Sequence, residues 1–413
     1  MLEGKIIKFY RERQNMMQKD LGSGICSSTH ISKIERGLTE VSKETIELLA
    51  KRLGIDMKSE IETYLGLDSL LKKWHEAIIM KLNSKAESIK KQLETVPLLH
   101  MPDIYRSYTL ILTRYYLLIG EDQYVDSLIG EMDRWLDLSP YDKNMLLHIK
   151  GIHGLLKKET DVSISFLHEI DPTYYNNQEY YYHLAFAYHS LNSRVLAYYY
   201  AEKSLRFFTE ERIFTRIIEA EMLMLIQVEQ DEYYHPKESE YQRLIEMTEN
   251  LGLKHQRSML IHNLAYQQVR KGDFEKACEY YEQSMDSRDP ETSYYLGSLE
   301  GYINSATRQG LKSTEELLQL AEKGISLSEK INETTFKHFF HLHKYNLKNN
   351  KEEYYQYLEK EVFPYFKKMG LVLLIEHYSI KLFDYHMEKG NTAEANTYAK
   401  FLVEKYRQKD YFV

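Results

Sequence analysis

The sequence predicts an all-α protein, and three observations lead to this expectation. Only 7 Pro and 18 Gly occur among the 413 residues, which favours helices joined by short turns over a sheet of many strands. Apolar residues make up 43% of the chain and charged residues 28%, the balance of a folded soluble protein. From about residue 104 onward, apolar residues recur at helical spacing in paired segments. A chain of this length is too long for one core, so it fits several domains or an elongated array.

The clearest pair of helices lies between Gln256 and Pro290, with its turn at Gly272. Small and large residues alternate around that turn in a fixed order: Leu264, Ala265 and Gln268 before it, and Phe274, Ala277, Tyr281 and Ser284 after it. Alanine at a helix crossing lets the two axes approach, while the large residues fill the space on either side. This order is the tetratricopeptide pattern. Because one pair cannot bury its own apolar face, we expect further pairs stacked on both sides.

Similar pairs recur about every 35–40 residues along the chain. We expect them over residues 104–136, 143–170, 179–208, 213–251, 293–331, 336–369 and 372–407, in addition to the pair above. Counting a long entry helix over 70–99, this makes about eight pairs, which should stack into a right-handed superhelix with a concave inner wall. The predicted domains are a head over 1–66, a connecting helix over 67–100 and a repeat array over 101–413.

The head is expected to hold five short helices, over residues 2–14, 17–21, 27–36, 43–53 and 56–71. Ser27 or Ser28 can cap the third helix, and Gly37 and Gly54 are well placed to end the third and fourth. Residues 1–58 hold 11 Lys and Arg against 8 Asp and Glu, although the whole chain carries a net charge of −8. A basic head on an acidic body predicts an anionic partner for the head alone.

The head resembles the helix-turn-helix of the phage-repressor (XRE) family. The matching residues are Arg11, Arg13, the run 18–21, Ile25, the run 31–37 and the run 48–53. The resemblance implies that Gln18 lies beside a phosphate, and that Ser28, Thr29 and His30 meet base edges in the major groove. It also implies phosphate contacts for Arg13, Lys33 and Arg36. No Gln or Asn stands at the front of the third helix to bind adenine. The alternative is a head used only for dimerisation or protein contact.

Asparagines on the first helices of the repeats are candidates for binding a peptide. Asn263 and Asn304 are expected on the inner wall, where a carboxamide can bond both the C=O and the N–H of an extended chain. Asn346 and Asn396 are further mid-helix asparagines, which helix propensity disfavours. Arg114, on an otherwise apolar stretch, could bind a carboxylate with both arms. Two structural alternatives remain open. The asparagines could form hydrogen bonds between helices, and Arg114 could form an ion pair within the protein.

Enzyme chemistry has little support in the sequence. No phosphate-binding loop, nucleophile elbow or dinucleotide motif is found, and no cofactor is expected. The cluster of His338, His341 and His343 could suggest a metal site. His338 and His341 are three residues apart and could share a helix face, but no third ligand for that pair is apparent, so a structural role is favoured. Cys26 and Cys278 are expected to be reduced thiols in a cytoplasmic protein, because no signal peptide and no apolar run long enough to span a membrane is found.

A repressor-type head before a tetratricopeptide body resembles the RRNPP group of peptide-sensing regulators, particularly the NprR and PlcR branch, with a length closer to NprR. The resemblance implies a cytoplasmic quorum-sensing transcription factor, homo-oligomeric and acting on double-stranded promoter DNA. A short signalling peptide would bind the concave wall, and the asparagines at 263 and 304 match the group's use of repeat asparagines for peptide backbone. A second possibility is a Rap-like protein that binds a response regulator of the sporulation phosphorelay. A third is a passive scaffold.

Overall fold

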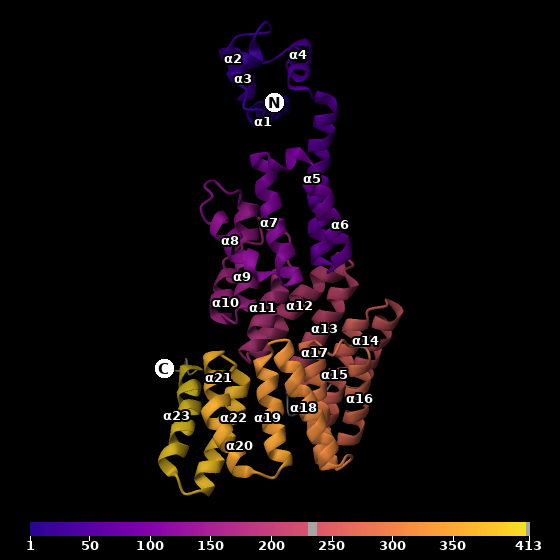
Figure 1. The fold of residues 1–413 in the computed structure, drawn as a ribbon, viewed down its shortest axis with the longest axis vertical. Helices are drawn as coiled ribbons and strands as arrows, with labels where there is room; N and C mark the ends of the chain where they lie inside the picture. Colours follow the sequence, from indigo (N-terminus) through magenta and orange to yellow (C-terminus); the bar gives the residue numbers. More distant parts are fainter. Residues whose placement is uncertain (230–237, 410–413) are drawn as a thin grey trace. The chain divides into compact units, whose positions relative to one another are not determined.

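The computed structural model describes residues 1–229 and 238–409, and these residues form helices and turns without a strand. The all-α prediction is therefore confirmed for the part of the chain that is described (Figure 1). The chain divides into two compact units. The first consists of Met1–His153 with Glu169–Asn176, and the second of Gly154–His168 with the chain from Asn177 onward.

Four short helices form the head within the first unit: α1 (Leu2–Arg13), α2 (Gln18–Gly22), α3 (Ser28–Glu35) and α4 (Lys43–Leu53). Their bounds agree with the sequence prediction to within about two residues. Ser27 caps α3, because its hydroxyl oxygen accepts a bond from the backbone N–H of His30. Ser42 caps α4 in the same way. Ile6, Leu21 and Ile34, from three different helices, are fully buried and form the centre of the head.

The next helix differs from the prediction. The sequence suggested a short helix over 56–71 and a long one over 70–99, but α5 runs unbroken over Met57–Ile79 and α6 over Asn83–Glu94. Gly66 lies on an open helix surface and does not interrupt α5. The break comes instead at Lys81, which has a φ of 57° and is followed by a closing bond from Leu82 N–H to Ala77 C=O. The expected boundary at residues 66 and 67 therefore falls inside α5.

The stretches predicted as helix pairs each contain two helices, except 336–369, whose second half is divided into two, so the prediction of recurring pairs is confirmed in the described residues. The pairs in the order of the chain are α7 (Pro102–Ile119) and α8 (Asp122–Met132), α9 (Pro140–Leu156) and α10 (Thr160–His168), α11 (Tyr180–Ser190) and α12 (Arg194–Glu210), α13 (Phe214–Glu229) and α14 (Glu238–Asn250), α15 (Lys254–Lys271) and α16 (Phe274–Asp286), α17 (Ser293–Gln309) and α18 (Thr314–Lys330), α19 (Thr334–Leu347) with α20 (Lys351–Tyr357) and α21 (Phe363–Lys368), and α22 (Val372–Glu388) and α23 (Thr392–Lys409). A π-helical turn, Leu358–Val362, joins α20 to α21. The short 3-10 helix η1 spans Pro97–His100.

The pair α15–α16 packs as the repeat pattern predicts. Ala265 and Ala277 are fully buried where the two helices cross. Gly272 ends α15 with a φ of 79°, a conformation that glycine adopts without strain. At the next crossing Gly301 of α17 lies so close to the ring of Tyr281 that a methyl group there would overlap it. Small residues thus set the spacing between successive helices.

Buried serines connect α15, α16 and α17. The hydroxyl of Ser258 donates to the C=O of Ser284 at 2.7 Å, and the hydroxyl of Ser284 donates to the C=O of Ser258 at 2.9 Å. The Ser284 hydroxyl also lies 3.0 Å from that of Ser298, which in turn is hydrogen-bonded to Nδ1 of His262 at 3.0 Å. All three serines are fully buried. This set of side chains, called the serine network below, joins α15, α16 and α17 by buried hydrogen bonds within the second unit.

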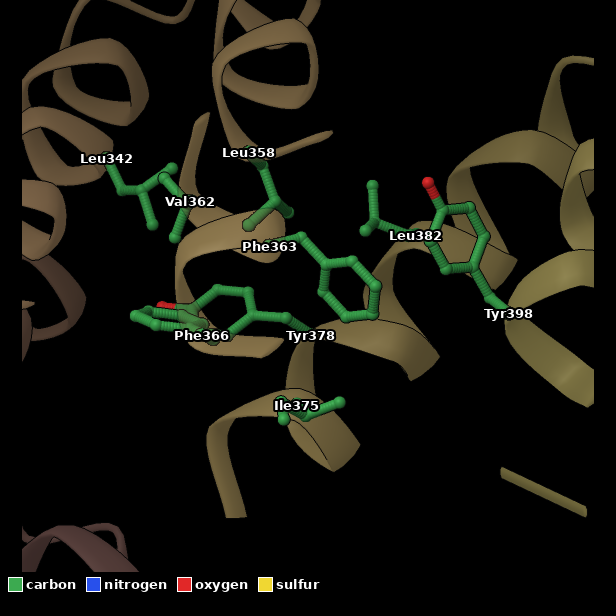
Figure 2. Close-up of a cluster of buried hydrophobic side chains, with 9 residues drawn as sticks. All are labelled: Leu342, Leu358, Val362, Phe363, Phe366, Ile375, Tyr378, Leu382 and Tyr398. Atoms are coloured by element: carbon green, nitrogen blue, oxygen red, sulfur yellow. The ribbon is translucent and has the colours of Figure 1, made fainter. Parts of the chain in front are cut away.

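The last repeats share an aromatic core (Figure 2). Its members come from α19, the π-helical turn, α21, α22 and α23: Leu342, Leu358, Val362, Phe363, Phe366, Ile375, Tyr378, Leu382 and Tyr398. The π-helical turn contributes Leu358 and Val362, both fully buried. Because this core binds the last two repeats together, α22 has a fixed position beside α19 and α21.

Candidate nucleic-acid interface and ligand-binding face

The outer side of α3 carries a row of polar side chains. Ser28, Thr29, Lys33 and Arg36 are exposed and His30 is half-buried, while Ile31 and Ile34 point into the head. The capped N-terminus of α3 presents Ser28 and Thr29 side by side. This is the arrangement that the sequence predicts for a helix that enters a DNA groove.

Gln18 is tied to the interior of the head. Its Nε2 donates to Oε2 of Glu35 at 2.8 Å, and Glu35 is buried. The same carboxylate accepts two bonds from Arg11, from Nε at 2.5 Å and Nη2 at 3.0 Å. The pairing with Glu35 raises the pKa of Arg11 further above its usual range. Glu35 thus joins α1, α2 and α3, so Gln18 has one amide hydrogen left for the phosphate contact that the resemblance implies.

Two other arginines of the head have different environments. Arg13, at the end of α1, is exposed. Arg52, in the last turn of α4, donates to the C=O groups of Leu21 (2.8 Å) and Ser23, which lie at the C-terminus of α2. A guanidinium there satisfies carbonyls that the helix itself leaves unpaired. Arg13 is therefore accessible to DNA, whereas Arg52 holds α2 against α4.

In the second unit, the first helices of four successive repeats carry polar side chains that helical spacing places along one face of each helix. We call this set the first-helix face; its members are His262, Asn263 and Tyr266 of α15, Glu300, Asn304 and Arg308 of α17, His343 and Asn346 of α19, and Lys381 of α22. Along α17 the three members lie four residues apart and therefore follow one line on the helix. The carboxylate of Glu300 bonds Nε2 of His343 at 2.7 Å, which joins α17 to α19.

Three of the four candidate asparagines lie on this face. Asn263 and Asn304 are half-buried, and within the described residues neither carboxamide forms a hydrogen bond. The bonds between helices that would explain them structurally are thus not seen. Asn346 is exposed and lines a pocket of about 290 Å³. Asn396 is separate, since it lies exposed on α23, the second helix of the last pair.

Arg114 does not lie on an open wall. It is 4% exposed within α7, which packs on α5 in the first unit. Its charge adds to burial in lowering the pKa of His75 to about 3. The expectation of a solvent-facing carboxylate clamp therefore does not fit its surroundings, because the apolar stretch around it is a buried helix core.

The histidines and cysteines that could carry metal or redox chemistry have identifiable surroundings. Nδ1 of His338 is hydrogen-bonded to the Tyr357 hydroxyl at 2.7 Å, and His341 packs against the same ring. Among the described residues, no cluster of three or more His, Cys, Asp or Glu is arranged to hold a metal ion. Both cysteines are free thiols; burial raises the pKa of Cys278 to about 11.

Sequence reasoning missed two cations of the first-helix face, Arg308 and Lys381. One signal was present. Arg270 and Arg308 each stand two residues before the glycine that ends a first helix, the position where a cation interacts well with the helix dipole. Lys381 has no comparable signal, because only the packing of α22 places it in one pocket with Asn346.

Comparison with known proteins agrees with this architecture. Residues 7–58 match the family model described as helix-turn-helix. The chain is 24% identical to the transcriptional activator NprA of Geobacillus stearothermophilus, over 92% of this chain and 97% of NprA.

Two solved structures share the fold. NprR in complex with its cognate peptide NprX matches with a TM-score of 0.64 and 20% identity, over 82% of this chain and 99% of NprR. A Rap protein complexed with Competence and Sporulation Factor matches with a TM-score of 0.69 and 13% identity, over 83% of this chain and 98% of the Rap protein.

A search of the described helices for one long and apolar enough to cross a bilayer finds none. The head thus matches a helix-turn-helix model, the chain aligns with the activator NprA along nearly its whole length, and it shares the fold of NprR.

Proposed function

We propose that this protein is a transcription regulator whose head binds promoter DNA and whose repeats bind a short peptide that controls that binding. The observation that carries the proposal is the combination of a helix-turn-helix head with a repeat face on which the carboxamides of Asn263 and Asn304 bond to none of the described residues. The likeness to the activator NprA and to a peptide-bound NprR supports both parts. The proposal includes a homo-oligomer in the cytoplasm.

For DNA, the support lies in the exposed row on α3. Ser28, Thr29 and His30 would contact base edges, since they follow the cap of the helix that the motif places in the major groove. Lys33, Arg36 and Arg13 are exposed cations that would contact phosphates, with Gln18 beside them.

For the peptide, the support lies in Asn263 and Asn304. A half-buried carboxamide without a partner loses hydrogen bonds to water, and an extended peptide backbone restores both a donor and an acceptor. Asn346 belongs to the same face and to the proposed site, whereas Arg114, buried in α7 of the first unit, and Asn396, exposed on the second helix of the last pair, are not included in it. Peptide binding would then change the population of head arrangements that fit two half-sites.

The test begins with DNA selection. The full chain is incubated with random double-stranded DNA, bound sequences are amplified, and the enriched sequence is used in gel shifts with and without pooled short peptides. We expect one enriched sequence, and a change in its apparent affinity on peptide addition. Binding of all DNA alike, with no effect of any peptide, would contradict the proposal.

A second function is favoured by the fold shared with a Rap protein over 83% of this chain. In this alternative the repeats bind a response regulator of the sporulation phosphorelay. Capture of such a regulator by the immobilised full chain, lost on peptide addition, would support it. The two functions are compatible, because the DNA-contacting row on α3 and the repeats are different surfaces.

A further inference from the structure

We propose that Arg288, in the turn between α16 and α17, forms a carboxylate-binding subsite next to His262 of the first-helix face. This inference rests on the proposed peptide-binding function and adds the chemistry of the ligand: the peptide presents a carboxylate to this guanidinium. The contact differs from those proposed for Asn263 and Asn304, because it recognises one charged group of the peptide and not its backbone.

The guanidinium of Arg288 is held in a defined orientation. Its Nε donates to the hydroxyl oxygen of Ser258 on α15, and its Nη1 donates to the C=O of Tyr294 on α17. Nη1 also donates to the hydroxyl oxygen of Ser298 at 3.4 Å. A guanidinium has five N–H donors, two of them on Nη2. Within the described residues Nη2 forms no hydrogen bond, so one end of an anchored guanidinium is left to bind a ligand.

This side chain reaches from the interior of the second unit to its surface. Arg288 is half-buried, and its partner Ser258 is fully buried. On the other side, Cζ of Arg288 lies 5.5 Å from the centre of the Tyr294 ring, and Tyr294 is 47% exposed. A ligand can therefore approach on the Tyr294 side, while the bonds to the serines fix the position of the cation.

Arg288 has no counter-ion within the described residues, since its bonds go to two hydroxyls and one C=O. Four other arginines of the same unit each pair with a glutamate: Arg206, Arg216, Arg243 and Arg257. Burial lowers the pKa of Arg288 to about 10, as expected for a cation that has lost part of its hydration. An anion supplied by a ligand would stabilise it.

The acids that flank Arg288 in the chain do not neutralise it. Asp289 accepts a bond from the backbone N–H of Glu291 at 2.9 Å, and Glu291 pairs with Lys330. Asp286, at the end of α16, forms no ion pair with any described residue. The positive charge at this turn is therefore not cancelled by its own loop.

A structural role does not require a guanidinium at this position. In the head, Arg52 bonds C=O groups at the end of α2, which the helix itself leaves unpaired. The acceptors of Arg288, in contrast, already have other partners. The hydroxyls of Ser258 and Ser298 lie 3.3 and 3.0 Å from that of Ser284, and the C=O of Tyr294 accepts from Ser298 at 3.4 Å. The serine network is thus complete without the cation.

Contacts between side chains connect the subsite to the proposed peptide surface. The Ser298 hydroxyl that accepts from Arg288 also lies 3.0 Å from Nδ1 of His262, the residue before Asn263 on α15. A Cβ at Gly297 of α17 would lie 3.4 Å from Phe336 of α19 and 3.8 Å from His262. Three successive first helices therefore meet beside Arg288, at the end of the first-helix face that carries His262.

A carboxylate matches the free end of this guanidinium. Its two oxygens accept hydrogen bonds, and bonds between a guanidinium and a carboxylate are about twice as strong as those between neutral groups. Two parts of a peptide carry this group: the C-terminus, and the side chain of Asp or Glu. Both offer the same chemistry to Nη2, and the experiment separates them.

The experiment uses the full chain and three pools of short synthetic peptides: one with free C-termini, the same pool with amidated C-termini, and an amidated pool without Asp or Glu. Bound peptides are identified by mass spectrometry, and the tightest is titrated by calorimetry. We expect the third pool to yield no tight binder. Retention of affinity by the second pool assigns an acidic side chain, and its loss assigns the C-terminus.

A cycle of protein variants and peptides then locates the contact. Arg288→Met should weaken the selected peptide about 10- to 100-fold, and so should replacing the carboxylates of the peptide by amides. Both changes together should cost no more than either alone, because they remove the same bond. Arg257→Met on α15 is the control and should have no effect, because its partner is Glu249.

A second variant covers the possibility that Arg288→Met disturbs the serine network. Arg288→Gln is neutral but can still donate to the Ser258 hydroxyl, so it should keep the melting temperature of the unchanged protein and lose affinity as Arg288→Met does. Arg288→Lys keeps the charge and should lose less affinity than either.

Three outcomes would overturn the inference. Losses that add in the cycle, or a tight peptide from the pool without carboxylates that is unaffected by Arg288→Gln, would reject the subsite while leaving peptide binding established. If no pool yields a peptide, the proposed peptide function fails and the subsite fails with it.

Discussion

The carboxylate of Glu35 and the guanidinium of Arg11 meet side by side, with Nε 2.5 Å from Oε1 and Nη2 3.0 Å from Oε2. Gln18 donates to the same carboxylate at 2.8 Å, so one buried acid connects three helices of the head. Replacing Glu35 leaves the half-buried Arg11 guanidinium and the Gln18 amide without this acceptor. The row of α3 that would read DNA depends on this junction for its position.

Glu35→Ala should destabilise the head by about 3 kcal/mol, since removing one partner of a buried ion pair leaves the other charge uncompensated. Native-state hydrogen exchange at the amides of Leu21 and Ile31 measures this, because both residues are fully buried and lie on helices that Glu35 joins. Glu12→Ala is the control: Glu12 also pairs with Arg11, at 3.1 Å, but is exposed. Equal exchange in the two variants would show that Glu35 has no special role.

Gly301→Ala should destabilise the repeats by about 1–3 kcal/mol, because the added methyl would overlap the buried Tyr281 ring. Gly66→Ala serves as the control, since it adds a methyl to an open helix surface and should be neutral or stabilise by up to about 1 kcal/mol. Urea denaturation of the full chain, followed by circular dichroism, compares them. A stabilised Gly301→Ala protein would contradict the packing described here.

His262 should make the repeats less stable in acid. Burial, and then the charge of Arg288, lower its pKa from 6.5 to about 4. Between these values the unfolded chain binds a proton that the folded chain does not, so stability falls as pH drops from 6.5 to about 4. The loss amounts to at most about 3 kcal/mol. His262→Gln should show a shallower fall over this window in denaturation curves; an unchanged slope would mean that the buried ring is not the cause.

The DNA contacts divide into two kinds that titration with salt separates. Replacing Thr29 and His30 should abolish discrimination between the selected operator and random DNA, because base edges are read there. Arg13→Ala should weaken all DNA alike and reduce the slope of log affinity against log salt by about 1. Identical behaviour of the two variants would refute this division.

The asparagines offer a matched pair. Asn304→Ala should reduce peptide affinity at least about tenfold without altering the melting temperature, because its carboxamide has no partner within the described protein. Asn396→Ala removes the same group from the outer helix α23 and should leave affinity unchanged. Calorimetry with a selected peptide measures both, and Asn263→Ala can be placed on the same scale. Equal losses at 304 and 396 would argue against the first-helix face.

Local signals explain why the head could be predicted from sequence almost residue by residue. Ser27, Ser42 and Gly54 start or end helices through bonds within their own turns, and those bonds need no distant partner. The break at Lys81 was missed because nothing in its residue type announces a positive φ. Gly66 gave a misleading signal, since an exposed glycine weakens a helix without ending it.

The candidate site was less predictable because its members come from different repeats. Asn304 followed from repeat register alone, but the burial of Arg114 depends on how α7 packs on α5. The bond between Glu300 and His343 joins residues 43 positions apart and arises only when α17 and α19 are both in place. Likewise, Glu35 could be matched to a family pattern while its bonds to Arg11 and Gln18 could not.

The serine network has a mechanical consequence. In repeat proteins each pair usually touches its neighbours through apolar surfaces that slide and re-pack at small cost. Directional bonds among Ser258, Ser284 and Ser298 tolerate little displacement, so the segment from α15 to α17 should move as one block. Any bending of the second unit would then concentrate on either side of this block, and force applied to the chain ends should extract α15, α16 and α17 together in a single step.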